Sequence, residues 1–220
     1  MMGTLYIVAT PIGNLEDITL RAIRVLKEVA VVACEDSRVT RTLLNKYEIK
    51  TPVVTYHQHS SSDEVLKRLN RGEDIALVTD AGTPGIQDPG GKLVREAINA
   101  GIKVVPIPGA SAVTAALSAA GVNADAFYFL GFLPKKQGRQ TLFSEMAGLD
   151  VPVVIYESPM RVSKTLKDIE QYLGNRQVVM ARELTKKFEE IKEGSAKELM
   201  DKFAKQKPKG EFILIILPAV

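Results

Sequence analysis

The chain has 220 residues, of which 45% are hydrophobic, so it can bury either one large core or two smaller ones. Its longest apolar stretches, near residues 29–34 and 212–217, are much shorter than the roughly 20 residues that cross a bilayer. The first residues lack the basic and apolar segments of a signal peptide. We therefore expect a globular, cytoplasmic protein, whose net charge of +3 permits an anionic partner without requiring one.

Strand-like segments alternate with helical ones along the first half of the chain, which is the βαβ rhythm of an α/β domain. We expect strands there over residues 5–10, 29–35, 52–57, 74–80 and 103–108. After the small-residue segment 110–121 the rhythm resumes, with strands expected over 127–132, 151–157, 178–183 and 212–217. The sequence therefore predicts an α/β protein of two α/β domains, residues 1–114 and 115–220, with the boundary inferred from the change of rhythm.

Cys34 is the only cysteine, which excludes an intramolecular disulfide and a thiolate-rich zinc site. It lies in an apolar run, and no histidine or lysine is adjacent in sequence to lower the pKa of its thiol. The sequence therefore predicts a small buried hydrophobic residue rather than a reactive thiol.

Helix starts are marked by local residue patterns. Ser61 with Glu64, and Ser195 with Glu198, have the spacing of a capping box ahead of apolar positions. In the segment 158–174, a serine and a proline precede apolar residues at helical spacing, and a glycine ends the pattern. A helix is therefore expected directly after the strand at 151–157.

Turns that follow predicted strands are rich in glycine, proline and polar residues. They span residues 11–14, 80–85, 108–112 and 157–159. Ligands of open parallel sheets bind beyond the carboxyl ends of the strands, where glycine lets the backbone approach a ligand closely. Each turn alone is consistent with ordinary turn chemistry, but together they favour a shared ligand cleft.

Several established motifs are missing from these positions. No G-x-G-x-x-G follows a strand, and no G-x-S-x-G occurs. The segment 85–92 has the wrong spacing for a phosphate loop, and Leu93 stands where a serine or threonine would hold magnesium. His57 and His59 could lie on one face of a strand, but no third ligand is nearby, so no metal site is expected.

The sequence resembles the tetrapyrrole methylase superfamily in motifs that occur in order over essentially the whole chain. The motifs lie at residues 9–15, 80–84, 108–112, 131–134, 156–161, 181–186 and 209–212. Within the superfamily, the chain is similar to the branch that methylates small-subunit ribosomal RNA on a cytidine 2′-oxygen. Corrinoid and porphyrin methylases usually begin with a glycine-rich turn, and Thr-Pro-Ile-Gly-Asn at residues 10–14 replaces it here, which favours RNA as the substrate.

The resemblance implies a class III methyltransferase that binds S-adenosylmethionine in the cleft between its two domains, forms a homodimer and uses no metal. Its cofactor contacts, carried over by motif, would be Pro11, Asp80, Gly82, Thr83, Ile86, Ser111 and Ala112 in the first domain and Glu157, Leu184 and Gly210 in the second. Many relatives also carry a helical extension after the last strand. Some RNA affinity is therefore expected to be missing here, or to be supplied by the second subunit.

Methyl transfer to a 2′-hydroxyl requires this oxygen to lie about 3 Å from the methyl carbon, in line with its bond to sulfur. A general base would assist, because the hydroxyl is a poor nucleophile at neutral pH. Candidates at strand ends are Glu35, Asp36 and His59, and each of them also has an ordinary structural explanation. The identity of the base stays open.

Basic residues gather in segments that follow strands, and lysine and arginine are the residues that contact RNA phosphates. The candidate RNA contacts are Arg38, Arg41, Lys135, Lys136, Arg139, Arg161, Lys186 and Lys187. Any one of them alone could equally belong to a solvated helix face. The expected partner is bare small-subunit RNA or the assembled small subunit.

Two other functions remain open at this point. A corrinoid or porphyrin C-methyltransferase would need a larger apolar trough and would have little use for the basic clusters. A non-catalytic RNA-binding ribosome-assembly protein would need no cofactor pocket, and the intact turns at 80–84 and 108–112 argue against it.

Overall fold

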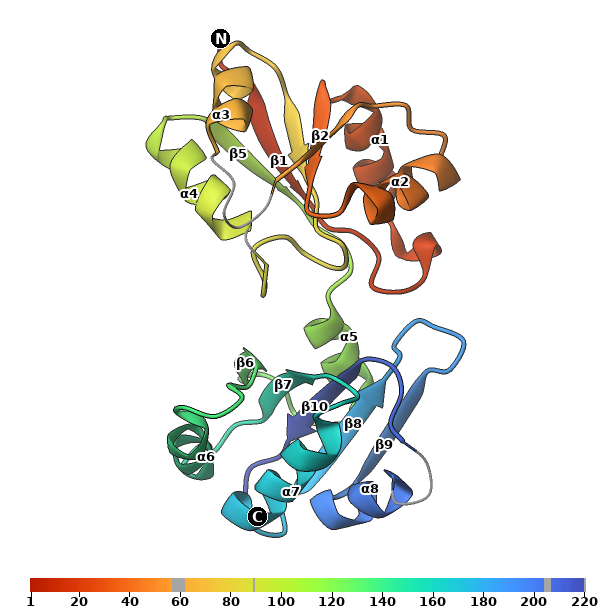
Figure 1. The fold of residues 1–220 in the computed structure, drawn as a ribbon, viewed down its shortest axis with the longest axis vertical. Helices are drawn as coiled ribbons and strands as arrows, with labels where there is room; N and C mark the ends of the chain where they lie inside the picture. Colours follow the sequence, from red (N-terminus) through yellow and green to blue (C-terminus); the bar gives the residue numbers. More distant parts are fainter. Residues whose placement is uncertain (57–61, 89, 204–206, 220) are drawn as a thin grey trace. The chain divides into compact units, whose positions relative to one another are not determined.

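The computed structural model describes residues 1–56, 62–88, 90–203 and 207–219, and the chain divides into two compact units (Figure 1). The units are Met1–Ser111 and Ala112–Val220. Helix α5 (Ala112–Ala119) packs against the second sheet and belongs to the second unit. No helix in the described ranges is long and apolar enough to cross a membrane.

The first unit is built on a parallel sheet with the strand order β3-β2-β4-β1-β5. Its strands are β1 (Thr4–Val8), β2 (Val31–Cys34), β3 (Val53–Thr55), β4 (Ile75–Leu77) and β5 (Lys103–Ile107). Its helices are α1 (Leu20–Glu28), α2 (Ser37–Lys46), α3 (Asp63–Asn70) and α4 (Gly90–Asn99), with a short 3-10 helix η1 (Leu15–Asp17). The predicted alternation is confirmed, and the strands are shorter than expected because their last predicted residues form turns.

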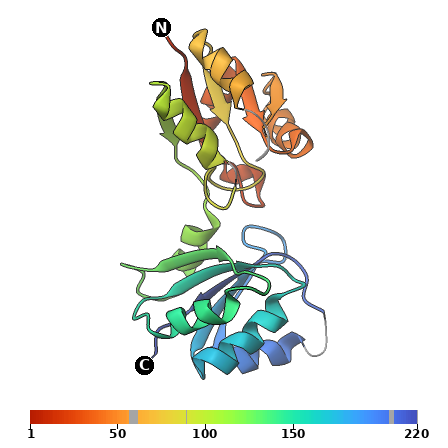
Figure 2. The same ribbon diagram turned by 60° about the vertical axis from the view of Figure 1, so that its left-hand side comes forward.

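Helices lie against both faces of this sheet (Figure 2), and buried apolar side chains fill the space between them and the strands. Helices α1 and α2 pack on one face around Leu26 and Cys34, and α3 and α4 pack on the other face around Leu69 and Leu93. A sheet buried on both faces needs strands that are apolar throughout, and every residue of β2 is buried. The prediction for Cys34 is confirmed, and burial raises the pKa of its thiol.

The second unit is built on a mixed sheet with the strand order β6-β7-β10-β8-β9. Its strands are β6 (Tyr128–Phe132), β7 (Val153–Glu157), β8 (Gln177–Arg182), β9 (Glu190–Ser195) and β10 (Phe212–Ile216). Its other helices are α6 (Arg139–Ala147), α7 (Val162–Leu173) and α8 (Ala196–Phe203). Strand β10 runs antiparallel to both β7 and β8, and β9 runs antiparallel to β8.

The core of the second unit also has two sides. Helix α5 packs on one face of the sheet through Val113, Ala116 and Leu117, while α6, α7 and α8 cover the other face. Strand β9 is not predicted by the sequence, because its segment Glu-Ile-Lys-Glu-Gly-Ser is charged and mostly exposed. Such a composition is typical of an edge strand, where charged side chains prevent further pairing.

The predicted helix starts have different outcomes. The capping box at α8 is confirmed: the N–H of Ser195 donates to Glu198 at 2.8 Å, and the N–H of Glu198 donates to the Ser195 hydroxyl at 3.3 Å. The box at Ser61 lies outside the described residues. Helix α7 begins at Val162, later than expected, because the carbonyl of Ser158 closes a turn before it.

Candidate functional site

Hydrogen bonds connect the turns after β1, β4 and β5 at the carboxyl edge of the first sheet. Thr10 and Gly82 exchange backbone hydrogen bonds of 2.9 and 3.0 Å. The hydroxyl of Thr10 donates to the carbonyl of Thr79 at 3.0 Å, and the hydroxyl of Thr83 donates to the carbonyl of Ala110 at 3.2 Å. The three turns that carry the predicted cofactor residues of this unit are therefore one connected surface.

Glycine is required at two points of this surface. Gly82 has a φ of +84°, which L side chains rarely adopt, and a Cβ there would lie 3.5 Å from Cγ2 of Ile12. A Cβ on Gly109 would come within 2.9 Å of the Cβ of Ala9. The close approach of the turns after β1 and β5 thus depends on the absence of a side chain at Gly109.

The predicted cofactor residues of the first unit and of the start of α5 differ in exposure. Asp80 and Ile86 are exposed, Thr83, Ser111 and Ala112 are half-buried, and Pro11 and Gly82 are buried. A ligand at this edge would therefore meet the side chains of Asp80 and Ile86. Pro11 and Gly82 instead shape the backbone beneath them.

Asp36 caps helix α2 and forms an ion pair with Arg38. Its carboxylate accepts the backbone N–H of Arg38 at 2.8 Å and the guanidinium at 2.7 Å, and this side-chain bond lowers the pKa of Asp36 to about 2. A general base works best with a pKa near the working pH, so Asp36 is a poor base. Asp36 therefore acts as a cap, whereas the Arg38 side chain is 88% exposed and its contact with RNA stays a prediction.

We expect Asp36→Ala to lower the free energy of unfolding, because α2 loses its N-cap, whereas Asp36→Asn retains a capping oxygen. The pKa of Asp36 is lower in the folded state, so its stabilising effect is full above the unfolded value near 3.9 and disappears as the pH falls through about 2. Urea unfolding of the three proteins at pH 7 and pH 3 checks this. Equal stability of both variants would contradict the capping role.

The remaining base candidates are Glu35 and His59. Glu35 is exposed just after β2 and lines a small cavity with Tyr56, Thr79 and Asp88. His57 and His59 lie outside the described residues. No group of three histidine, cysteine, aspartate or glutamate residues suited to a metal ion occurs in the part of the chain that the structure describes.

In the second unit, the antiparallel direction of β10 brings the turn before it to the ends of β7 and β8. Phe212 at the start of β10 pairs with Glu157 on one side and with Arg182 on the other. Gly210 therefore lies at the same edge as Glu157 and Leu184, although it precedes β10, whereas Glu157 ends β7 and Leu184 follows β8.

The carboxylate of Glu157 is engaged inside the second unit. Its side chain is fully buried, accepts the hydroxyl of Thr165 at 2.6 Å and the N–H of Ser158 at 2.8 Å, and pairs with Arg161 at 3.3 Å. These contacts give Glu157 a structural role in holding the turn after β7. Its carboxylate is thus already engaged within the unit, and a cofactor contact at Glu157 stays a prediction.

Arg139 is buried, which corrects its prediction as an RNA contact. Its guanidinium donates to Asp168 at 2.7 Å, to the hydroxyl of Thr165 at 2.9 Å and to the carbonyl of Pro134 at 3.1 Å. Arg161 is similarly engaged, with Glu157 and the carbonyl of Leu133. Both arginines are committed to holding loops of the second unit.

The other predicted RNA contacts fall into two groups. Lys186 pairs with Glu183 at 3.0 Å and with Glu211 at 2.7 Å, and Lys187 lies over the ring of Phe188. Arg41, Lys135 and Lys136 are exposed. Arg38 and Lys187 are exposed as well, so these five side chains are open to an anionic partner.

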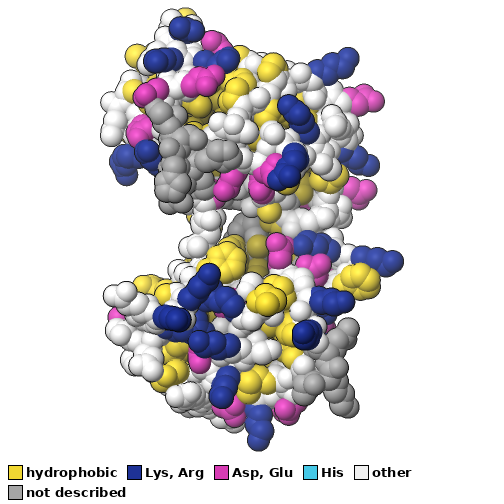
Figure 3. Space-filling model, viewed as in Figure 1, with side chains coloured by type: hydrophobic (Ala, Val, Ile, Leu, Met, Phe, Trp, Pro, Cys, Tyr) yellow, Lys and Arg dark blue, Asp and Glu magenta, His cyan; other side chains and the backbone are white. Residues whose placement is uncertain are grey.

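Lys164 is a surface cation that the sequence analysis missed. It lines the same open pockets as Lys135, on the first turn of α7, and Figure 3 shows lysine and arginine side chains gathered on the second unit. Its sequence signal is its position three residues after Arg161, on the exposed side of an amphipathic helix.

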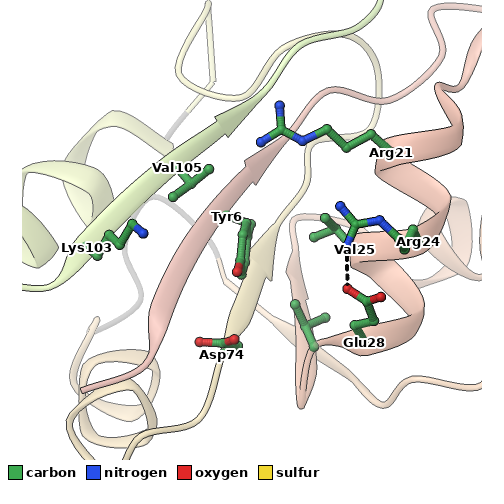
Figure 4. Close-up of a pocket in the computed structure, with 9 residues that line it drawn as sticks. Tyr6, Arg21, Arg24, Val25, Glu28, Asp74, Lys103 and Val105 are labelled. Carbon is green, nitrogen blue, oxygen red and sulfur yellow. Dashed lines mark hydrogen bonds and ion pairs between the residues drawn. The ribbon is translucent and has the colours of Figure 1, made fainter. Parts of the chain in front are cut away.

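Another pocket lies on the first unit, beside α1 (Figure 4). Its lining includes Arg21, Arg24, Glu28, Asp74 and Lys103. Arg24 pairs with Glu28 at 2.7 Å, and the pocket reaches the amino ends of β4 and β5. It is thus separate from the connected turns at the carboxyl edge.

Sequence comparison finds a family and close relatives. The model of the family described as Tetrapyrrole (Corrin/Porphyrin) Methylases matches residues 4–200. The chain is 49% identical over 219 residues to a protein of Halalkalibacterium halodurans named Ribosomal RNA small subunit methyltransferase I, covering 97% of this chain and 75% of that protein. It is 43% identical over 218 residues to a protein of the same name from Thermotoga maritima, covering 98% of both.

Solved structures share the fold at low sequence identity. A diphthine synthase aligns with a TM-score of 0.75 at 16% identity, covering 98% of this chain and 90% of that one. A cobalt precorrin-4 methyltransferase aligns with a TM-score of 0.72 at 21% identity, covering 96% and 94%. These likenesses concern the fold alone.

Proposed function

Because the chain belongs to the tetrapyrrole (corrin/porphyrin) methylase family, we propose that it is an S-adenosylmethionine-dependent methyltransferase of small-subunit ribosomal RNA. We propose further that it methylates the 2′-oxygen of a cytidine, as a cytoplasmic homodimer. RNA is supported as the substrate by the 42–49% identity, over nearly the full chain, to proteins named Ribosomal RNA small subunit methyltransferase I.

The connected turns of the first unit support the cofactor. Asp80 is exposed, and its Oδ1 accepts the backbone N–H of Asp36 at 3.2 Å. Its Oδ2 remains able to accept a hydroxyl or amino group, which is the chemistry that a nucleoside offers. The turn that Gly82 makes possible brings backbone close to the same place. These residues fit S-adenosylmethionine, which would supply a methyl group activated by its positive sulfur.

The contribution of the chain to the reaction is mainly positional. Its residues must hold the ribose so that the 2′-oxygen lies about 3 Å from the methyl carbon and in line with it. Glu35 follows β2, the neighbour of β4 in the sheet, and its carboxylate is the described candidate for taking the hydroxyl proton. Asp36 is the weaker candidate, because it caps α2 and its hydrogen bond with Arg38 lowers its pKa to about 2. His59 stays a prediction.

The proposal is tested by incubating the protein with S-adenosylmethionine that carries a labelled methyl group, and with bare small-subunit RNA or assembled small subunits. We expect label on one cytidine of at least one substrate, mapped by nuclease digestion and mass spectrometry. A matched RNA fragment with 2′-deoxycytidine at the mapped position should stay unlabelled.

Other outcomes would overturn specific parts of the proposal. Label on the deoxy fragment would place the methyl group on the base. Label on a corrinoid or porphyrin, with none on RNA, would establish the small-molecule alternative. RNA binding without saturable S-adenosylmethionine binding in calorimetry would leave the non-catalytic assembly protein.

A further inference from the structure

Two adjoining open pockets lie on the second unit, where the loop after β6 meets the turn after β7 and the start of α7. Their volumes are about 290 and 470 Å³, and both are lined by Lys135, Arg139 and Lys164. Lys136 lines the smaller pocket, and Met160 lines the larger one. We call the surface formed by Lys135, Lys136, Lys164 and Met160 the lysine pocket.

The free charge of the lysine pocket is positive. Lys135, Lys136 and Lys164 are exposed, and none of them has a carboxylate partner among the described residues. The nearby carboxylates of Asp168 and Glu157 are already paired, at 2.7 and 3.3 Å, with arginines beneath the surface. Cations grouped in this way repel one another, and an anion bound between them relieves that repulsion.

The loop that carries Lys135 and Lys136 is held from below. The carbonyl of Pro134, directly before Lys135, accepts Arg139 at 3.1 Å, and the carbonyl of Leu133 accepts Arg161. Two arginines therefore hold the backbone that positions Lys135. Such preorganisation lowers the entropy lost on binding.

The pocket combines charge with apolar surface. The side chain of Met160 is largely exposed, at 91%, next to the lysines. A free phosphate would use the lysines alone, whereas a single-stranded RNA offers a phosphate together with the apolar face of a ribose or base. The larger volume, about 470 Å³, falls in the range of 300–1,000 Å³ that is typical of ligand sites.

We propose that the lysine pocket binds the backbone of the substrate RNA, with Lys135 and Lys164 contacting a phosphate and Met160 lying against the adjoining nucleoside. Lysine acts here as a point charge, so the contact positions the strand without reading its sequence. The inference rests on the proposed function, because it takes the partner to be RNA.

The test compares RNA binding by the wild type, Lys135→Ala/Lys164→Ala and Met160→Ala, measured by fluorescence anisotropy over a range of salt concentrations. The double variant should bind about tenfold more weakly at low salt, with a slope of log K against log salt that is reduced by about 1. Met160→Ala should weaken binding without changing the slope. Affinity for S-adenosylmethionine should be unchanged in both variants.

The matched control is Arg21→Ala/Lys103→Ala, which removes the same charge from the pocket in Figure 4 and should leave RNA binding unchanged. Equal losses in the control and in Lys135→Ala/Lys164→Ala would mean that net charge alone matters, and would overturn the inference. Wild-type RNA affinity in Lys135→Ala/Lys164→Ala would also overturn the inference, even if that variant no longer binds inorganic phosphate. A wild type that neither binds nor methylates RNA would instead refute the proposed function.

Discussion

Replacing Arg139 with methionine is expected to destabilise the second unit by about 3–5 kcal/mol, because a nearly buried carboxylate loses its partner. Asp168 pairs with Arg139 at 2.7 Å, and their side chains are only 15% and 7% exposed. The hydroxyl of Thr165 and the carbonyl of Pro134 lose a donor as well. Hydrogen exchange of α6 and α7, together with urea unfolding followed by circular dichroism, measures the loss.

Two further variants test whether the unpaired carboxylate of Asp168 causes the loss of stability. Lys136→Met removes an exposed charge three residues away and should change stability by less than about 0.5 kcal/mol. Arg139→Met/Asp168→Leu removes both members of the pair and should regain part of the loss, because no unpaired charge is left. If the Arg139→Met protein is stable but binds RNA more weakly, then Arg139 contacts RNA, as the sequence suggests.

Replacing Gly82 with valine is expected to weaken S-adenosylmethionine binding at least about tenfold, because the strain of about 1–3 kcal/mol at a φ of +84° falls on the connected turns. The branched side chain would extend beyond a Cβ that already lies 3.5 Å from Ile12 and 3.8 Å from the carbonyl of Ala110. The hydrogen bonds between Thr10 and residue 82 should lengthen or break. Isothermal titration calorimetry with S-adenosylmethionine measures the effect.

Gly101→Val is the matched control. Gly101 has a φ of +73° with open space around it, and it lies between α4 and β5, at the opposite end of β5 from the connected turns. It should cost a similar amount of stability without changing cofactor affinity. If both variants lose affinity equally, the effect is one of general destabilisation and not of the turns after β1, β4 and β5.

The predictions of cofactor and RNA contacts were based on the family resemblance. The structure shows what each of these side chains contacts. Pro11, Gly82 and Thr83 belong to turns joined by hydrogen bonds, so their predicted grouping has a physical basis. Arg139 and Glu157 are charged residues next to turns, a pattern that fits a binding surface equally well. Only their buried partners show that both hold the fold.

Local sequence was enough to predict the alternation of strands and helices, the buried state of Cys34 and the capping box at Ser195. These features depend on apolar periodicity, turn chemistry and capping, and neighbours within a few residues set all three. Strand β9 escaped prediction because an exposed edge strand has no apolar pattern.

Which charged side chains are engaged and which are exposed depends on the three-dimensional packing of the chain. Arg139 meets Asp168, 29 residues away, and the antiparallel β10 brings Gly210 beside the end of β7. Lys135 and Lys164 line one pocket because a loop and a helix start meet in space. Such contacts join segments far apart in the chain, so the packing of the sheet and its helices decides them and local sequence does not.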